Sequence, residues 1–346
     1  MNSMREKEPL VSIMIPNYNY GHYLRQCLNS VYEQTYQNIE VVFLDNCSKD
    51  DSLAIAKEYI PKGLKVCRNP YNIFTDSYKL LSNVLINGKY MMLLPSDDYI
   101  KPDFVKKCVQ IMEEYDHVGY VHVEREFVDE QGEVIAPEEP FYNCSFVAPG
   151  EDVLPIYMMT TVAHPAQAMY RRNLFEKIGG FAQFVEHLNA DRGLWFYLST
   201  VSDYAYIKEK LACVRRGRYT ETAVSITNFQ HPVAVGMTLL DFIDTSKALG
   251  NEKAAAREKQ AKQKFAVEML DYSMDMLLLE NYEAAEKYLL FCEIFYRGIV
   301  THEHYIEIAE MIRKRTIDKE AVYKMKSREG HHRNYEPPEN YRQLQV

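Results

Sequence analysis

The sequence predicts an α/β fold in which helices flank a mainly parallel sheet, followed by an α-helical C-terminal region. Apolar runs of strand length alternate with segments of helical periodicity over the first hundred residues, an order typical of right-handed βαβ units. These runs end in loops with polar or acidic side chains, so the chemically active residues are expected at one edge of the sheet. Past residue 232 the glycines become fewer and apolar residues recur every three or four positions, which favours helices.

The first strand is predicted at residues 10–16, an apolar run that ends at Pro16 and continues into the turn-forming residues of an exit loop. The next strand closes on Asp45, and a second loop rich in turn-forming residues follows it. The elements predicted up to residue 68 are a helix at 23–34, a strand at 39–44, a helix at 52–59 and a strand at 64–68.

A further strand is predicted at residues 90–94, because this continuous apolar run stops at Asp97 and Asp98. Two neighbouring carboxylates repel each other, so a site that holds both usually supplies a cation or protons. Mg²⁺ and Mn²⁺ prefer carboxylate oxygens, water and phosphate as ligands. The alternative is that the two acids cap the helix that begins near Pro102.

The length and composition limit the classes of protein that fit. A chain of 346 residues suggests two domains, and a net charge of −9 argues against nucleic acid as the main partner. The seven cysteines include no Cys-x-x-Cys pair, which fits reduced thiols in a cytoplasmic protein. Residues 1–9 lack the apolar core of a signal peptide. No apolar run approaches the roughly 20 residues of a membrane span, so membrane contact is expected only at the periphery.

Three ordered segments then carry a resemblance to a known family. Residues 11–19 contain the strand and exit loop, residues 28–36 contain Ser30, Gln34 and Thr35, and residues 39–50 end in Asp-Asn-Cys-Ser-Lys-Asp. In this order and at this spacing they resemble the opening of a family 2 glycosyltransferase with the GT-A fold. The resemblance covers about the first two thirds of the chain. It implies a transferase domain at 1–235, and the helical pattern predicts a helical domain at 236–323 before a polar tail at 324–346.

The resemblance implies a binding site for a nucleotide sugar around the first two loops. Pro16, Asn17 and Tyr18 would line the base pocket, with the Tyr18 ring as a flat apolar surface for a nucleobase. Asp45 would accept a hydrogen bond from the imide N–H of the base. Asn72 is a further candidate, although Phe74 stands where the family has a glycine. The alternatives are a surface tyrosine at 18 and an Asx turn at Asp45.

The resemblance also implies a metal site. The family usually has Asp-Ser-Asp-Asp where this chain has Pro95, Ser96, Asp97 and Asp98. Since the first acid is missing, Asp97 becomes the primary ligand of Mn²⁺ or Mg²⁺ and Asp98 its neighbour, with Ser96 near the donor. The loss of that acid puts the ribose contact usually made there in question.

The catalytic base implied by the resemblance is Asp191. The family has Glu-Asp before an amphipathic helix, and this chain has Ala190 and Asp191 at that place. Inverting transfer needs a carboxylate that takes the proton from the acceptor hydroxyl. Asp191 could also cap the helix, and one residue could do both.

The resemblance further implies that a basic residue after the strand at residues 211–214 helps to hold the donor diphosphate. Arginines occupy positions 215, 216 and 218, and guanidinium suits phosphate through its paired donors and permanent charge. Arg215 and Arg216 are the candidates, with a solvated basic loop as the alternative.

The sequence therefore predicts an enzyme that moves a sugar from a nucleotide-diphosphate donor, with UDP favoured, to a hydroxyl acceptor. The acceptor would be a cell-surface glycan, a lipid-linked molecule or a protein, and the enzyme would work in the cytoplasm or at the inner face of the membrane. The helical region would serve a homodimer or another partner. The alternative is a non-catalytic scaffold, which the replacement of family acids by Pro95 and Ala190 favours. A nucleotidyltransferase is disfavoured, because Pro16 to Tyr18 stand where such enzymes have a glycine-rich, arginine-containing loop.

Overall fold

The computed structural model describes residues 8–73, 85–135, 138–160, 162–180, 190–216, 225–326 and 335–345. Its contacts divide the chain into two compact units. We call Met1–Val153, Thr161–Gly217 and Arg333–Val346 the sheet unit, and Leu154–Thr160 and Arg218–His332 the helical unit. The sequence placed the division at residue 235, whereas the contacts place it after Gly217.

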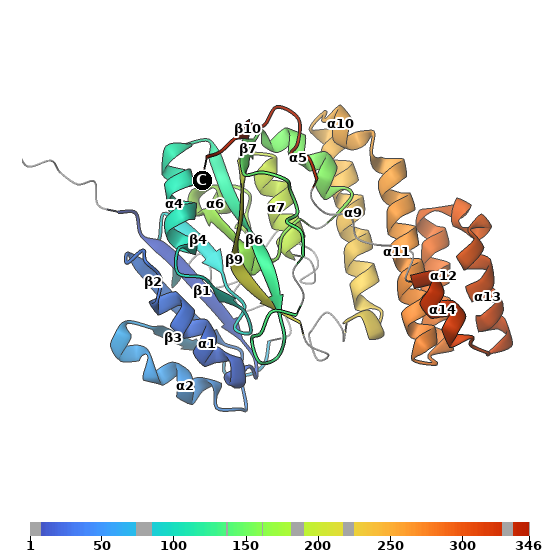
Figure 1. The fold of residues 1–346 in the computed structure, drawn as a ribbon, viewed down its shortest axis with the longest axis horizontal. Helices are drawn as coiled ribbons and strands as arrows, with labels where there is room; N and C mark the ends of the chain where they lie inside the picture. Colours follow the sequence, from blue (N-terminus) through green and yellow to red (C-terminus); the bar gives the residue numbers. More distant parts are fainter. Residues whose placement is uncertain are drawn as a thin grey trace, which may run out of the picture. The chain divides into compact units, whose positions relative to one another are not determined.

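The sheet unit is built on one mixed sheet with the strand order β10-β7-β9-β6-β8-β4-β1-β2-β3, and β5 pairs with β9 (Figure 1). β1 lies parallel between β2 and β4, while β8 is antiparallel to both β4 and β6. The strands are β1 Val11–Asn17, β2 Ile39–Asp45, β3 Lys65–Arg68, β4 Tyr90–Leu93, β5 Tyr99–Ile100, β6 Val118–Val128, β7 Phe146–Ala148, β8 Ala168–Arg171, β9 Asp203–Arg215 and β10 Arg342–Gln343.

Helices cover this sheet because its central strands are apolar on both faces. The apolar stripe of α1 packs into the same core as alternate residues of β1, namely Val11, Ile13 and Ile15. The helices of the sheet unit are α1 Gly21–Tyr32, α2 Ser52–Glu58, α4 Phe104–Glu114, α6 Arg172–Lys177 and α7 Ala190–Ser199, with short 3₁₀ turns η1 Ile60–Lys62 and η2 Pro165–Gln167, while α5 Gly150–Tyr157 begins in this unit and ends in the helical unit. The predicted α/β fold class is confirmed. Each strand and helix predicted up to residue 68 is present, and its boundaries lie within two residues of the predicted ones.

The helical unit contains a series of helices joined by short turns (Figure 1). Asn251 and Asn281 begin two of them, since each side chain accepts a hydrogen bond from the backbone N–H three residues later. The helices are α9 Gln230–Ala248, α10 Glu252–Ala255, α11 Glu258–Leu278, α12 Tyr282–Phe295, α13 Glu303–Lys314 and α14 Lys319–Lys326, with the 3₁₀ turn η4 Arg297–Thr301. The predicted helical region is confirmed. No helix among the described residues has both the length and the apolar character needed to span a membrane.

The end of the chain differs from the expected polar tail. β10 pairs antiparallel with β7, the Leu344 N–H donates to the Ser145 carbonyl at 2.9 Å, and the Tyr335 N–H donates to the Phe141 carbonyl at 2.8 Å. The physical reason is that an edge strand leaves backbone groups unpaired, which this segment satisfies while Leu344 packs into the hydrophobic core.

Glu40 joins three segments at the end of the sheet opposite the loops described below. One oxygen of its carboxylate accepts from the Ser12 hydroxyl and the Gly88 N–H, and the other accepts from Lys65 Nζ at 2.7 Å. Burial alone would raise the pKa of Glu40, but the hydrogen bonds from Lys65, Ser12 and Asn87 outweigh it and lower that pKa to about 2. The folded state therefore favours the charged carboxylate.

We expect Glu40→Gln to lower the free energy of unfolding at pH 7 by about 2 kcal/mol, because it removes charged hydrogen bonds from a largely buried position. The contribution of Glu40 is complete above its ordinary pKa near 4.5 and is lost as the pH falls toward about 2. Urea unfolding followed by the fluorescence of Trp195, the single tryptophan, measures this. The difference between wild type and variant should shrink at pH 3, and the exposed Glu33→Gln serves as the control. An equal difference at both pH values would contradict the account.

Candidate active site

The loops after β1 and β2 are joined by side-chain hydrogen bonds at the carboxyl ends of these strands. Asn17 Nδ2 donates to Asp45 Oδ1 at 3.3 Å and to Ser48 Oγ at 3.0 Å. Asn19 adopts a left-handed conformation with φ of 58°, and its side-chain oxygen accepts from the Lys49 N–H at 2.8 Å. Tyr18, between them, is 39% exposed. The two loops therefore form one surface that presents the Tyr18 ring to solvent.

Asp45 lies beneath this surface and is only 1% exposed. Its carboxylate accepts from the Ser48 N–H at 3.1 Å and forms an ion pair with Arg68 Nε at 3.2 Å. Arg68 ends β3 directly beside Asp45 in the strand register. These contacts hold a negatively charged acceptor in a fixed orientation, as selective recognition of an N–H group requires.

Asn72 belongs to an amide network next to Asp45. Its side-chain oxygen accepts from Asn46 Nδ2 at 2.8 Å, and the Asn46 oxygen accepts from Asn69 Nδ2 at 2.9 Å and from the Ile73 N–H at 3.0 Å. The network fixes the loop after β3 against the loop after β2. Phe74, at the position of the family's glycine, lies outside the described residues.

Asp97 and Asp98 follow β4, which pairs with β1 on the side opposite to β2. Asp98 is buried, its Oδ1 accepts from the Arg215 N–H at 2.8 Å, and its Oδ2 lies 3.3 Å from His164 Nδ1. Asp97 is only partly buried. Burial, followed by repulsion from Asp97, raises the pKa of Asp98 well above its usual value. Burial also raises the pKa of Asp97, although Arg215 and His22 oppose this. The two adjacent acids thus have different environments, and Asp97 has the more accessible carboxylate.

Arg215 holds several loops together from the inside. Its Nε donates to the Asp97 carbonyl at 2.9 Å, its Nη2 donates to Gln26 Oε1 at 2.6 Å, and its Nη1 donates to the Asp129 carbonyl. The guanidinium also lies over the Tyr23 ring at 4.1 Å. Nε, Nη1 and Nη2 of this buried guanidinium thus each donate to a group inside the protein.

Arg216 has the opposite environment. Its side chain is exposed, stacks on the Phe127 ring at 3.5 Å and lies 3.9 Å from Glu138 Oε1. Stacking orients the guanidinium while leaving its donors accessible to a phosphate. Of the two predicted arginines, Arg216 therefore has the more suitable position for a donor diphosphate.

We expect substitutions at these two arginines to have different effects. Arg215→Met should lower the free energy of unfolding by about 3 kcal/mol, because buried carbonyls lose their donor. Arg216→Ala should leave stability within about 0.5 kcal/mol, as for other surface changes, and should weaken donor binding about tenfold through the loss of one charged contact. Urea unfolding and calorimetric titration with a nucleotide sugar measure the two effects, and the reverse pattern would contradict these roles.

Asp191 stands in the first turn of α7, and the strand pairing shows which edge of the sheet this turn approaches. β6 runs in the same direction as β4, because both are antiparallel to β8. Along α7, Ser199 hydrogen-bonds Tyr120 of β6, and the Trp195 ring lies 4.8 Å from the His122 ring, further toward the carboxyl end of β6. One more turn, about 6 Å, leads to Asp191. The first turn of α7 is therefore directed toward the edge that carries Asp45 and Asp97.

The sequence analysis did not assign His164 and the residues that hold it to the site. The His164 N–H donates to Gln167 Oε1 at 2.9 Å, and Gln167 Nε2 donates to the Val123 carbonyl at 2.8 Å. Arg125 Nη1 also donates to Gln167 Oε1, at 2.7 Å. The only sequence signal was the pair His164-Pro165, which is too common a pattern to identify a site residue.

Ser96 and Asp97 are the described groups best placed for a cation. No three Asp, Glu, His or Cys side chains gather into a metal site within the described residues. Ser96 Oγ is buried and has no hydrogen-bond partner among the residues that the structure describes, and the side chain of the next residue, Asp97, is partly exposed. This arrangement fits a hard divalent cation that takes one protein carboxylate and completes its shell with water and phosphate oxygens.

Comparisons with known proteins show which family and which folds the chain resembles. The family model described as Glycosyl transferase family 2 matches residues 12–179. An uncharacterized glycosyltransferase of Rickettsia prowazekii is 28% identical over 222 residues, which are 63% of this chain and 68% of the relative. Residues 12–179 therefore match a glycosyl transferase family 2 domain. This match confirms the predicted resemblance and the prediction of a glycosyltransferase.

Two solved structures share their fold with most of the chain. S. aureus TarS 1-349 in complex with UDP-GlcNAc has a TM-score of 0.55 and 18% identity, and the match covers 90% of this chain and 95% of TarS 1-349. The mannosyltransferase PcManGT from Pyrobaculum calidifontis, in complex with GDP-Man and Mn²⁺, has a TM-score of 0.51 and 16% identity over 94% of this chain and 89% of its own. At these identities the likeness concerns the fold. The sheet with its helices thus matches known glycosyltransferases.

Proposed function

We propose that this glycosyltransferase transfers a sugar from a nucleotide-diphosphate donor to an acceptor hydroxyl with inversion at the anomeric carbon. The observation that carries the proposal is the placement of three acids. Asp45 and Asp97 follow the two parallel neighbours of β1, and the turn of α7 that carries Asp191 is directed toward the same edge. Open α/β sheets bind ligands at the carboxyl ends of strands, where the strand order reverses.

The donor base lies on Tyr18 in this proposal, with its imide N–H directed to Asp45. The ring of Tyr18 is exposed, and the Asp45 carboxylate is held by Ser48 and Arg68. A uracil base presents one imide N–H, which matches a fixed carboxylate acceptor. The TarS complex with UDP-GlcNAc supports UDP as the donor nucleotide, whereas the PcManGT complex contains GDP-Man.

A divalent cation, Mn²⁺ or Mg²⁺, would be held by Asp97 together with the donor diphosphate. The accessible carboxylate of Asp97 and the buried hydroxyl of Ser96 fit such an ion, and the PcManGT complex contains Mn²⁺. When bound, the cation supplies positive charge that stabilises the leaving diphosphate. Asp98 would support the loop from inside through the Arg215 N–H, and Arg216 would add a charged contact to the diphosphate.

Asp191 acts as the general base in the proposed reaction. Its carboxylate accepts the proton of the acceptor hydroxyl while that oxygen forms a bond to the anomeric carbon. The bond from the anomeric carbon to the diphosphate oxygen breaks at the same time, and its electron pair leaves with the nucleoside diphosphate. The products are the new glycoside, the diphosphate and a protonated Asp191.

The proposed acceptor is a hydroxyl of a glycan that is free, lipid-linked or attached to a protein. One relative is the chondroitin synthase of Escherichia coli, which is 31% identical over 134 residues, or 38% of this chain and 19% of the synthase. That enzyme's name supports a polysaccharide as the acceptor class.

Thermal-shift measurements against a panel of nucleotide sugars, each with and without Mn²⁺, test the proposed function. A ligand present at 100 times its Kd stabilises the folded state by about 2.7 kcal/mol, so one donor should raise the melting temperature clearly, and more so with Mn²⁺. The purified protein should then release nucleoside diphosphate from that donor. A chain that binds no nucleotide sugar and releases no diphosphate would contradict the proposal and favour the scaffold alternative.

A further inference from the structure

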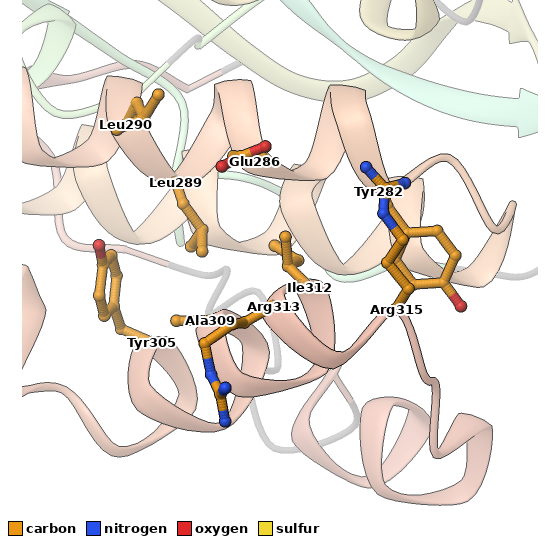
Figure 2. A pocket seen from close by; sticks show the side chains of 9 residues that line it. All are labelled: Tyr282, Glu286, Leu289, Leu290, Tyr305, Ala309, Ile312, Arg313 and Arg315. Atoms are coloured by element: carbon orange, nitrogen blue, oxygen red, sulfur yellow. The ribbon is translucent and has the colours of Figure 1, made fainter.

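The helical unit carries a cavity that the proposed transfer reaction does not use. It has a volume of about 340 Å³ and lies between α12 and α13. Figure 2 shows Leu289 of α12 and Ile312 of α13 in the space between the two helices, with Glu286 on the α12 side and Arg313 on the α13 side. We call this cavity and the exposed residues beside it the α12–α13 groove.

Large apolar side chains beside the groove are exposed to solvent. Leu290, which lines it, is 57% exposed, Ile294 one turn later on α12 is 73% exposed, and Ile306 on α13 is 56% exposed. Single exposed apolar residues are ordinary, but several on two adjacent helices mark an interaction surface.

Two contacts show how α12 and α13 align. The Arg315 guanidinium lies 5.9 Å from the centre of the Tyr282 ring, and the Tyr305 hydroxyl donates to Glu293. The low-numbered end of one helix therefore lies beside the high-numbered end of the other. In this antiparallel alignment Glu286 and Arg313 stand at the same height, on opposite sides of the groove.

Glu286 and Arg313 form no close ion pair within the described residues of the helical unit. Glu286 forms no ion pair with another residue in the part of the chain that the structure describes. Arg313 lies 4.0 Å from Glu310, whose oxygen is closer to Lys314, at 2.6 Å. One unpaired acid and one weakly paired base in the described part of the chain thus lie on the two helices that border the groove.

We propose that this groove is the contact surface between two copies of the chain, related by a two-fold axis that runs along it. Such an axis places α12 of one copy over α13 of the other and leaves the height along the groove unchanged. Glu286 of each copy then meets Arg313 of its partner, and the exposed leucine and isoleucines are covered. A two-fold contact must be self-complementary in this way. If a residue of the first copy contacts a second residue of its partner, the same two residues also meet with the copies exchanged. An unrelated protein would not need opposite charges at equal height.

The size of the groove indicates a weak affinity. Helices of 14 and 12 residues are about 20 Å long, so a surface two helices wide offers roughly 400 Å² per copy. Two such surfaces bury roughly 800 Å² in total, which is below the range of stable interfaces and indicates a weak, transient contact. We therefore expect a reversible dimer with a Kd on the order of micromolar.

Sedimentation velocity of the full chain over roughly 1 to 100 μM tests the proposal, since this range brackets a micromolar Kd. The wild type should shift from monomer to dimer as its concentration rises. Glu286→Arg and Arg313→Glu should each weaken dimerisation by at least about tenfold, because each places like charges together twice per dimer. Glu307→Arg is the matched control, since Glu307 is exposed on α13 but does not line the cavity. Melting temperatures verify that each variant is folded.

Mixing the two variants gives the sharpest result. Glu286→Arg and Arg313→Glu chains should form a mixed dimer in which both ion pairs are attractive again, at concentrations at which each variant alone is mainly monomeric. A wild type that stays monomeric over the whole range overturns the proposal and leaves the groove to a different protein. A dimer that both charge reversals leave intact overturns it as well, because the contact then lies elsewhere.

Discussion

Asp191→Asn is expected to lower the rate of sugar transfer by about 10³-fold, because an amide cannot take the proton of the acceptor hydroxyl. Asparagine has nearly the same shape, and Asp191 lies within the first turn of α7 rather than in its core-packing face, so α7 should remain folded. The affinity for the nucleotide sugar should therefore stay within about twofold, a difference well under 1 kcal/mol. Release of nucleoside diphosphate under saturating donor measures the rate, and calorimetric titration measures the binding.

The matched control is Asp116→Asn, which changes an exposed acid just before β6, at the opposite edge of the sheet. It should leave both quantities unchanged. A wild-type rate in Asp191→Asn would refute the assignment of the base. A parallel loss of donor binding would instead assign Asp191 to the binding of the donor.

Asp97→Ala is expected to abolish the part of nucleotide affinity that depends on Mn²⁺. Loss of a residue that merely orients a metal ligand typically costs 10- to 100-fold in affinity, so loss of the ligand itself should cost at least about 100-fold. Calorimetric titration of the wild type and the variant, with Mn²⁺ and with a chelator, separates the two contributions. In the chelator, the two proteins should bind the nucleotide about equally.

Asp98→Asn provides the contrast, because this buried neighbour accepts from the Arg215 N–H inside the protein. It should lower the melting temperature while keeping the increase in affinity that Mn²⁺ produces. Unchanged wild-type affinity with and without Mn²⁺ would contradict a metal role for Asp97. Loss of the Mn²⁺ effect in Asp98→Asn alone would exchange the roles of the two acids.

The positions of Asp45 and Asp97 could be predicted because they follow from local patterns. Apolar runs of strand length predicted β2 and β4, and parallel neighbours necessarily bring the residues after them to one edge. The structure confirms these strands. The role of each residue within its loop could not be predicted in the same way, since Asp97 and Asp98 are adjacent and chemically identical. Their different burial depends on Arg215, more than a hundred residues later in the chain.

The features that sequence reasoning missed depend on contacts between distant segments. Arg215 and Arg216 are equivalent in sequence, but the carbonyls of Asp97 and Asp129 engage only the first. β10 has two exposed polar residues, a pattern that carries no strand signal because its pairing uses backbone groups alone. His164 lies close to Asp98 because η2, which His164 precedes, leads directly into β8. Each of these requires the folded chain.

The placement of Asp45, Asp97 and Asp191 around one nucleotide sugar is tested most directly by a crystal structure of the Asp191→Asn variant with UDP-sugar and Mn²⁺. The account predicts the base on Tyr18 with its imide N–H donating to Asp45, the diphosphate oxygens and the cation at Asp97, and residue 191 within about 5 Å of the anomeric carbon, the reach of a near-attack geometry with an acceptor oxygen between them. A nucleotide sugar bound elsewhere, or a residue 191 directed away from the anomeric carbon, would contradict it.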